Sequence, residues 1–344
     1  MNTPNTKYRS NQSVDRLIAF SISYQRENLL ARGVGLEHLR EFMLGIARPL
    51  LRQGASLAYG GSWAQMEGNF TYDLLELIKA EQEDNSIQGP DTSFPIGSLY
   101  NHVAWPYYDS ITPEIEAQWV NCCRIIRVTQ EEAGFREDEI LGPAGSDSDS
   151  NSDRIVFNRA YVLSAMRRIM SEGCDLSLPA LGHQAFVPGV AARIVIGGKV
   201  DGYAGMMPGF FEETLHALRR GIPLYILGGF GGGGEVLAKG LLADAGATVP
   251  ELGFDHHRRE TPDVACINEL CGKFRKPAGF TPESLFDELG SAIDNAAANF
   301  PRSLSNGLSE DENRLLLTTS DINEARRLVR MGLNQNFNMS RLAE

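Results

Sequence analysis

Paired glycines at the ends of short apolar runs are the feature that most constrains the fold of this chain. The three pairs are Gly60-Gly61, Gly197-Gly198 and Gly228-Gly229. Each pair follows a run of about five mostly apolar or β-branched residues, which is typical of parallel strands buried on both faces. Two further strands are expected at 16–23 and 125–129.

Segments with apolar residues at helical spacing lie between these runs. They cover residues 36–52, 70–82, 159–170 and 210–220. Pro49 is expected to bend or end the first of them, because proline lacks the N–H that an α-helix uses. Strands that alternate with such helices predict an α/β fold, here a Rossmann-like, doubly wound parallel sheet with helices on both faces.

Composition divides the chain into three regions. The first, 1–14, is polar, and we expect a disordered N-terminus there. The Rossmann-like domain is expected at 15–248, with the acidic, serine-rich segment 142–153 as a mobile loop. The glycine clusters stop after 245, and 249–344 is expected to form a helical C-terminal appendage. Its clearest helix signal is the capping box that starts at Ser309.

Charge and cysteine usage exclude several classes of protein. The chain has 32 Lys and Arg against 44 Asp and Glu, a net charge of −12, so strong nucleic-acid binding through a general phosphate field is not expected. Five cysteines do not form a disulfide framework, which favours a cytoplasmic protein. No apolar run is long enough to predict a membrane span. The spacing of His256, His257, Cys266 and Cys271 fits no standard zinc pattern, so no metal is expected.

The segment 197–213 combines a glycine-rich loop with the start of a helix. Pro208 and Gly209 open that helix, whose free N–H groups and positive dipole end can hold an anion. Glu212 and Glu213 lie in its first turn, where one can act as a cap and the other can face the cleft. The expected ligand contacts here are Gly197, Gly198, Lys199, Gly205, Pro208, Gly209 and Glu212.

The loop 228–234 holds six glycines in seven positions, more than a tight turn needs. We interpret it as backbone that passes close to a ligand or to another loop, although a flexible strand-to-helix turn is the alternative. Open α/β sheets bind ligands at the carboxyl ends of their strands. Contacts are therefore also expected from Gly60, Gly61, Gly228, Gly229, Phe230 and Gly231.

At these residues the chain resembles the SLOG superfamily, which includes LOG-type nucleotide phosphoribohydrolases, DprA-like proteins and nucleotide-sensing domains of bacterial conflict systems. The run PGFFEE at 208–213 is similar to the LOG motif Pro-Gly-Gly-x-Gly-Thr-x-x-Glu. Glu213 matches the glutamate that in the family contacts the ribose and takes part in N-glycosidic cleavage. The family also has an arginine on the preceding helix, for which Arg159 and Arg167 are the favoured candidates here.

The resemblance covers about 16–245 and is closest to a defence-linked bacterial branch. It implies that the protein binds a nucleotide or an NAD- or ADP-ribose-derived molecule as a sensor or effector component of antiphage defence. No cofactor is implied, and an effector protein and a second copy of the chain are the implied partners. The alternative is an N-glycosidase that cleaves the base–ribose bond. Phe210 replaces the threonine of the LOG motif, so binding is better supported than turnover, and whether the protein is an enzyme is left open.

Overall fold

The computed structural model describes ten segments of the chain. They are 16–24, 26–30, 33–88, 99–142, 152–178, 183–243, 247, 249–260, 262–273 and 280–338. The expected disordered N-terminus and most of the expected mobile loop at 142–153 lie outside these residues.

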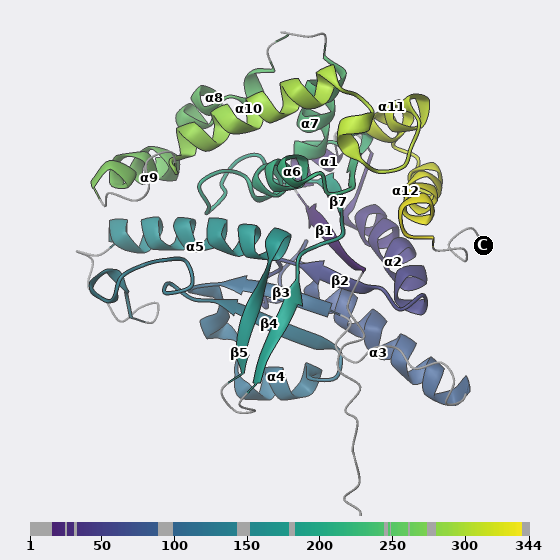
Figure 1. The fold of residues 1–344 in the computed structure, drawn as a ribbon, viewed down its shortest axis with the longest axis horizontal. Helices are drawn as coiled ribbons and strands as arrows, with labels where there is room; N and C mark the ends of the chain where they lie inside the picture. Colours follow the sequence, from purple (N-terminus) through teal and green to yellow (C-terminus); the bar gives the residue numbers. More distant parts are fainter. Residues whose placement is uncertain are drawn as a thin grey trace, which may run out of the picture.

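Six parallel strands form the central sheet (Figure 1). They are β1 (Leu17–Ser23), β2 (Ser56–Tyr59), β3 (Leu99–Ala104), β4 (Cys123–Val128), β7 (Ala192–Gly197) and β8 (Leu224–Leu227). Their order is β4-β3-β2-β1-β7-β8, so the chain builds outward from β1 in one direction and then returns to β1 to build in the other. The expected Rossmann-like α/β fold is confirmed, and β1 and β7 flank its topological switch point.

The sheet differs from expectation at two places. Strand β3 was not anticipated, because its sequence LYNHVA interrupts the apolar run with an asparagine and a histidine. The strand expected third, at 125–129, is therefore the fourth. A separate antiparallel hairpin, β5 (Gly173–Leu178) and β6 (His183–Pro188), accounts for the extra length before β7.

Helices cover both faces of the sheet. Helices α2 (Leu36–Arg52), α3 (Thr71–Gln88) and α12 (Ile322–Phe337) share one apolar core with Ile18 and Phe20 of β1. The opposite core joins Leu17 and Ala19 to α5 (Ser152–Glu172), α6 (Gly209–Arg220) and α7 (Gly232–Leu242). Alternate residues of β1 are buried on opposite faces of the sheet. Both faces therefore need apolar side chains, which explains why the strand is an unbroken apolar run in the sequence.

Shorter helices connect these layers. They are α1 (Arg26–Leu30), η1 (Tyr107–Ser110), α4 (Pro113–Trp119), η2 (Glu137–Glu139), η4 (Gly228–Phe230), η5 (Pro250–Leu252), α8 (Phe254–Glu260), α9 (Pro262–Lys273) and η6 (Arg302–Leu304). Pro49 does not end α2, which continues to Arg52. No helix in the described part of the chain is both long and apolar enough to cross a membrane.

The C-terminal helices are part of the same packed structure. Helix α10 (Pro282–Ala298) covers α6 and α7, whereas α11 (Glu310–Thr318) packs on β8 and α12 packs on α2 (Figure 1). The expected capping box is present, with Ser309 N donating to Glu312 Oε2 at 2.8 Å. Asp321 caps α12, since its carboxylate accepts from Asn323 N and Glu324 N.

Candidate functional site

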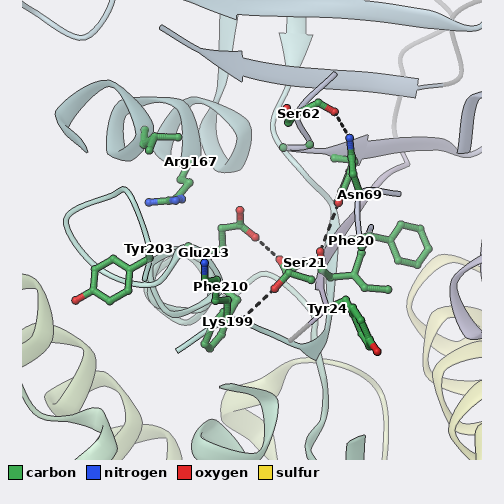
Figure 2. A pocket seen from close by; sticks show the side chains of 18 of the residues that line it. Phe20, Ser21, Tyr24, Ser62, Asn69, Arg167, Lys199, Tyr203, Phe210 and Glu213 are labelled. Carbon is green, nitrogen blue, oxygen red and sulfur yellow. Dashed lines mark hydrogen bonds between the residues drawn. The ribbon is translucent and has the colours of Figure 1, made fainter. Parts of the chain in front are cut away.

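A cavity of about 380 Å³ lies at the carboxyl ends of β1, β2 and β7 (Figure 2). The end of β1 forms its floor, the loop after β2 forms one side, and α5 and the start of α6 form the other. This is the topological switch point, where open α/β sheets bind their ligands. The volume falls within the range of about 300–1,000 Å³ that is usual for small-molecule sites.

Helix α6 begins at the wall of this cavity. Pro208 is its N-cap residue, and Pro208 O accepts the first helical hydrogen bonds, from Phe211 N at 3.0 Å and Glu212 N at 3.2 Å. The amides of Gly209 and Phe210 make no such bond to the described backbone, and both residues line the cavity. The expectation that Pro208 and Gly209 open a helix is confirmed, and two amide donors remain for an anion.

Glu213 reaches the cavity from α6, just past the first turn, which holds Glu212 but not Glu213, contrary to expectation. Its Oε2 accepts from Arg193 Nη1 at 2.6 Å and from the hydroxyl of Ser21. Figure 2 shows the other carboxylate oxygen directed away from Ser21, on the side of the cavity. That oxygen, Oε1, accepts no hydrogen bond from the described residues, and it lies 4.0 Å from where a side chain on Gly60 would begin.

Arg193 forms a buried ion pair with Glu213. It lies on β7, is fully buried, and also donates from Nη1 to Ser21 Oγ at 2.8 Å and from Nη2 to Ser171 Oγ at 3.3 Å. Burial lowers the pKa of Arg193, Glu213 opposes this shift, and the charge of Arg167 adds to it. Arginine nevertheless remains protonated in proteins, so Arg193 is a fixed positive charge beneath the carboxylate.

A second buried ion pair holds Arg167 at the wall of the cavity. Arg167 comes from α5, and its Nη1 lies 2.6 Å from Glu212 Oε2. A Cβ on Gly205 would lie 2.7 Å from Arg167 Nη1, and one on Gly209 would lie 2.8 Å from Nη2. The absence of side chains at these two positions therefore lets the loop and the start of α6 close around the guanidinium group.

The loop after β7 brings Lys199 to the same cavity. Gly197 and Gly198 have φ values of +66° and +103°, which glycine adopts without strain. The backbone then turns so that Lys199 N donates to Ser23 Oγ at 3.0 Å. The exposed Lys199 side chain lines the opening and makes no ion pair with any described residue.

The loop after β2 forms the opposite rim. Gly60 and Gly61 line the cavity, and Asn101 of β3 fixes this loop by donating to Tyr59 O and Gly61 O, both at 3.1 Å. Asn101 also accepts from Trp63 Nε1 at 2.8 Å. The polar residues that obscured β3 in the sequence thus include one that holds the rim of the site.

Comparison with known protein families identifies the family of this chain. The family model described as SLOG cluster2 matches residues 13–316. The chain belongs to the SLOG cluster2 family. A comparison with curated proteins finds no match. Membership in the SLOG superfamily points to a nucleotide-related function for this protein.

Six of the residues expected at the SLOG site line the cavity together. They are Gly60, Gly61, Arg167, Lys199, Gly209 and Glu213. Gly197, Gly198, Gly205, Pro208 and Glu212 lie directly behind this lining, where they shape the loop or pair with Arg167. Arg159 lies about two turns before Arg167 on α5 and is not part of the lining, so of the two candidate arginines only Arg167 faces the cavity.

The structure does not bring Gly228, Gly229, Phe230 and Gly231 to the cavity, contrary to expectation. These residues form η4 and its end, and they are buried. A side chain on Gly228 would collide with Leu317 O, and one on Gly229 would collide with Thr319 O. The glycines at these two positions therefore allow the backbone of η4 to pack closely against α11.

Several residues of the site were not anticipated from the sequence. Ser21 and Arg193 lie inside strands, and sequence patterns alone do not show that their side chains meet across β1 and β7. Tyr24, Asn69 and Tyr203 also line the cavity, and each lies within about eight residues of a predicted glycine pair or strand end. The sequence signal that could have identified Tyr24, Asn69 and Tyr203 is their position shortly after the ends of strands, where open α/β sheets bind ligands.

Proposed function

We propose that this SLOG cluster2 protein binds a nucleotide or an NAD- or ADP-ribose-derived small molecule in the cavity at the switch point. The observation that carries the proposal is the division of the cavity into two chemically different sides. Arg167, Lys199 and the start of α6 provide positive charge and donors, whereas Glu213 provides a carboxylate acceptor. A phosphorylated sugar presents the complementary groups.

The cationic side is suited to a phosphate group. Backbone amides at a helix start, a guanidinium group and an ammonium group are the donors that proteins use for phosphate. Arg167 is already oriented by Glu212, so little conformational freedom is lost when it binds an anion. A chain of net charge −12 can therefore still bind an anion at this site.

The acidic side is suited to sugar hydroxyl groups. Glu213 Oε1 is a charged acceptor without a protein donor among the described residues, and it faces the space that Gly60 leaves open. A ribose hydroxyl donates well to such an acceptor. Tyr24, Tyr203 and Met66, which also line the cavity, offer apolar surface for a base.

Isothermal titration calorimetry with AMP, ADP-ribose, NAD and cyclic ADP-ribose isomers tests this proposal. Arg167→Gln should weaken binding about 10- to 100-fold, because a charge-assisted hydrogen bond contributes about 1.5–3 kcal/mol. Arg168→Gln is the matched control, since Arg168 is the next residue of α5 but is exposed and pairs with Glu172. Equal affinities of the two variants, or no binding by the unmodified protein, would contradict the proposal.

A second candidate function is hydrolysis of the base–ribose bond, and the free Oε1 of Glu213 favours it. This oxygen can stabilise the positive charge that develops on the sugar when the C–N bond breaks. Water then supplies the hydroxyl group to the sugar and a proton to the base. Free base that appears with the unmodified protein, but not with Glu213→Gln, supports hydrolysis. Recovery of a tightly bound, intact ligand contradicts it.

The biological role that we propose is that of a sensor or effector component of bacterial antiphage defence. It rests on the similarity of the segments 193–213, 223–232 and 306–316 to a defence-linked branch of the superfamily. We propose that the protein acts with an effector protein or a second copy of itself. Phage challenge of cells that carry the unmodified chain or Glu213→Gln tests this role, and equal protection by both would contradict a role for the cavity.

A further inference from the structure

We propose that Arg193 is a positioning residue that keeps Glu213 ionised and directs one of its oxygens toward a hydroxyl group of the ligand. The inference rests on the proposed function, because it concerns how the cavity recognises its ligand. It goes beyond that function by assigning a role to a strand residue that does not line the cavity.

Three structural elements fix the Arg193 guanidinium group. The side chain rises from β7 and is fully buried. Nη1 donates to Glu213 of α6 and to Ser21 of β1, at 2.6 and 2.8 Å, and Nη2 donates to Ser171 of α5 at 3.3 Å. A group held from three directions has little freedom to move, so its partner Glu213 is held as well.

These bonds distinguish the two carboxylate oxygens of Glu213. Ser21 Oγ accepts from Arg193, so the hydroxyl proton of Ser21 is directed to Glu213 Oε2. Oε2 therefore has two donors, and Oε1 is left for the cavity. Residue 60, which lines the same cavity, is glycine, and a side chain there would begin 4.0 Å from Oε1 and 3.3 Å from Met166 Cε. Arg193 and Ser21 thus determine where a ligand hydroxyl group can donate.

Arg193 also decides the charge of this buried carboxylate. Burial favours the neutral acid, and a bonded cation reverses that preference. Arg167 is the other buried arginine among the described residues, but its bond goes to Glu212. Lys199 is exposed, so solvent screens its charge. Arg193 is therefore the cation on which the ionised state of Glu213 depends.

Burial displaces the pKa values of several other titratable groups around Glu213. Burial lowers the pKa of His102 on β3 to about 4, and it also lowers the pKa of His216 on α6. Burial raises the pKa values of the phenols of Tyr59 and Tyr203. Glu67, on the loop after β2, also lines the cavity. A pH dependence that appears on removal of Arg193 can be assigned to Glu213 by adding Glu213→Gln.

The first test needs no ligand. In Arg193→Met, Glu213 is buried without its cation and retains its proton to a higher pH than in the unfolded chain, where glutamate ionises near about pH 4.3. Stability from that proton is present at low pH and is lost as the pH rises. The quantity to measure is the Tm of Arg193→Met minus the Tm of the double variant that carries Arg193→Met and Glu213→Gln. We expect this difference to fall by several degrees between about pH 5 and about pH 8. The Tm of the unmodified protein minus the Tm of Glu213→Gln should show no such fall.

The second test measures binding of ADP-ribose over the same pH range. Arg193→Met should bind at least about tenfold more weakly at pH 7 and should recover part of this loss toward higher pH, as Glu213 ionises. Glu213→Gln should be weak at every pH. If Arg193 were only structural, any loss in Arg193→Met would be independent of pH, and that result would overturn the proposal.

The two measurements separate this inference from the proposed function. A flat Tm difference overturns the role of Arg193 even if ADP-ribose binds. A falling Tm difference without binding of any nucleotide supports the Arg193–Glu213 coupling and contradicts the proposed function. If Arg193→Met does not fold, Arg193→Lys replaces it. Lysine keeps the positive charge but cannot donate from two nitrogen atoms as the guanidinium group does. Weaker binding whose affinity does not change with pH therefore supports the proposal, and an affinity that changes with pH overturns it.

Discussion

Glu212 and Glu213 are neighbours near the start of α6, yet each carboxylate pairs with a different arginine. Glu213 turns to Arg193 and the cavity, whereas Glu212 is almost fully buried behind Arg167. The sequence predicted that one acid caps α6 and the other faces the cavity; Glu213 does face the cavity, but Glu212 pairs with Arg167 and does not act as a cap. The identity of their partners was not predictable, because Arg167 and Arg193 are brought to α6 by packing between elements that are distant in the chain.

The Arg167–Glu212 pair gives a prediction at this scale. Glu212→Gln removes the negative charge and leaves a buried guanidinium group with only a neutral partner. The free energy of unfolding should fall by about 3 kcal/mol, since breaking a buried ion pair costs about 3–5 kcal/mol. Urea unfolding at neutral pH measures the change.

An exposed ion pair provides the control for Glu212→Gln. Arg219 and Glu288 lie 2.6 Å apart, but both side chains are well exposed. Glu288→Gln should therefore change the free energy of unfolding by less than about 1 kcal/mol. Equal effects of the two substitutions would show that Glu212 does not act as a buried partner of Arg167.

At the scale of elements, the strands with at least a short apolar run were predictable, but β3, in which polar residues interrupt the apolar run, was not. Strands β1, β2, β7 and β8 end where glycine or serine follows an apolar run, and the expected ranges agree with the structure. The sequence pattern does not predict strand β3, because Asn101 and His102 interrupt its apolar run. The structure explains Asn101, which bonds the rim of the cavity.

The loop at 228–234 follows a strand, as predicted, but its first four residues do not line the cavity. The prediction that its backbone passes close to another group is correct. The approaching group at Gly228 and Gly229 is the end of α11 rather than the cavity, and no local pattern encodes the position of a helix about ninety residues away.

A substitution at Gly229 distinguishes these two interpretations. Gly229→Ala places a methyl group against Thr319 O, so the free energy of unfolding should fall by about 1–3 kcal/mol, as for other overpacked sites. Affinity for nucleotides, measured where the variant is folded, should not change. Gly290→Ala in α10 is the control, because its Cβ meets nothing and alanine favours a helix, so it should not destabilise. Loss of affinity without loss of stability in Gly229→Ala would restore the ligand-loop interpretation.

At the scale of the whole molecule, the C-terminal helices complete both apolar cores of the SLOG fold. Leu328 and Val329 of α12 are buried with α2, and Phe286 and Leu289 of α10 are buried with α6. Asn306 and Asn313, both buried, join this region to β8 through Leu224 O. The helical character of the region was predictable from its caps. Its place on both faces was not, because that depends on long-range packing.

The central claim is that the cavity at the switch point binds a nucleotide-derived ligand through Arg167 and the start of α6. Native mass spectrometry after incubation with an equimolar mixture of AMP, ADP-ribose, NAD and cyclic ADP-ribose isomers tests it most directly. Gly209→Val is the variant of choice, because its side chain begins 2.8 Å from Arg167 Nη2 and occupies the phosphate side. The unmodified protein should retain a nucleotide-derived ligand that Gly209→Val does not retain. A mass without ligand for the unmodified protein, or the same ligand on both proteins, would contradict the account.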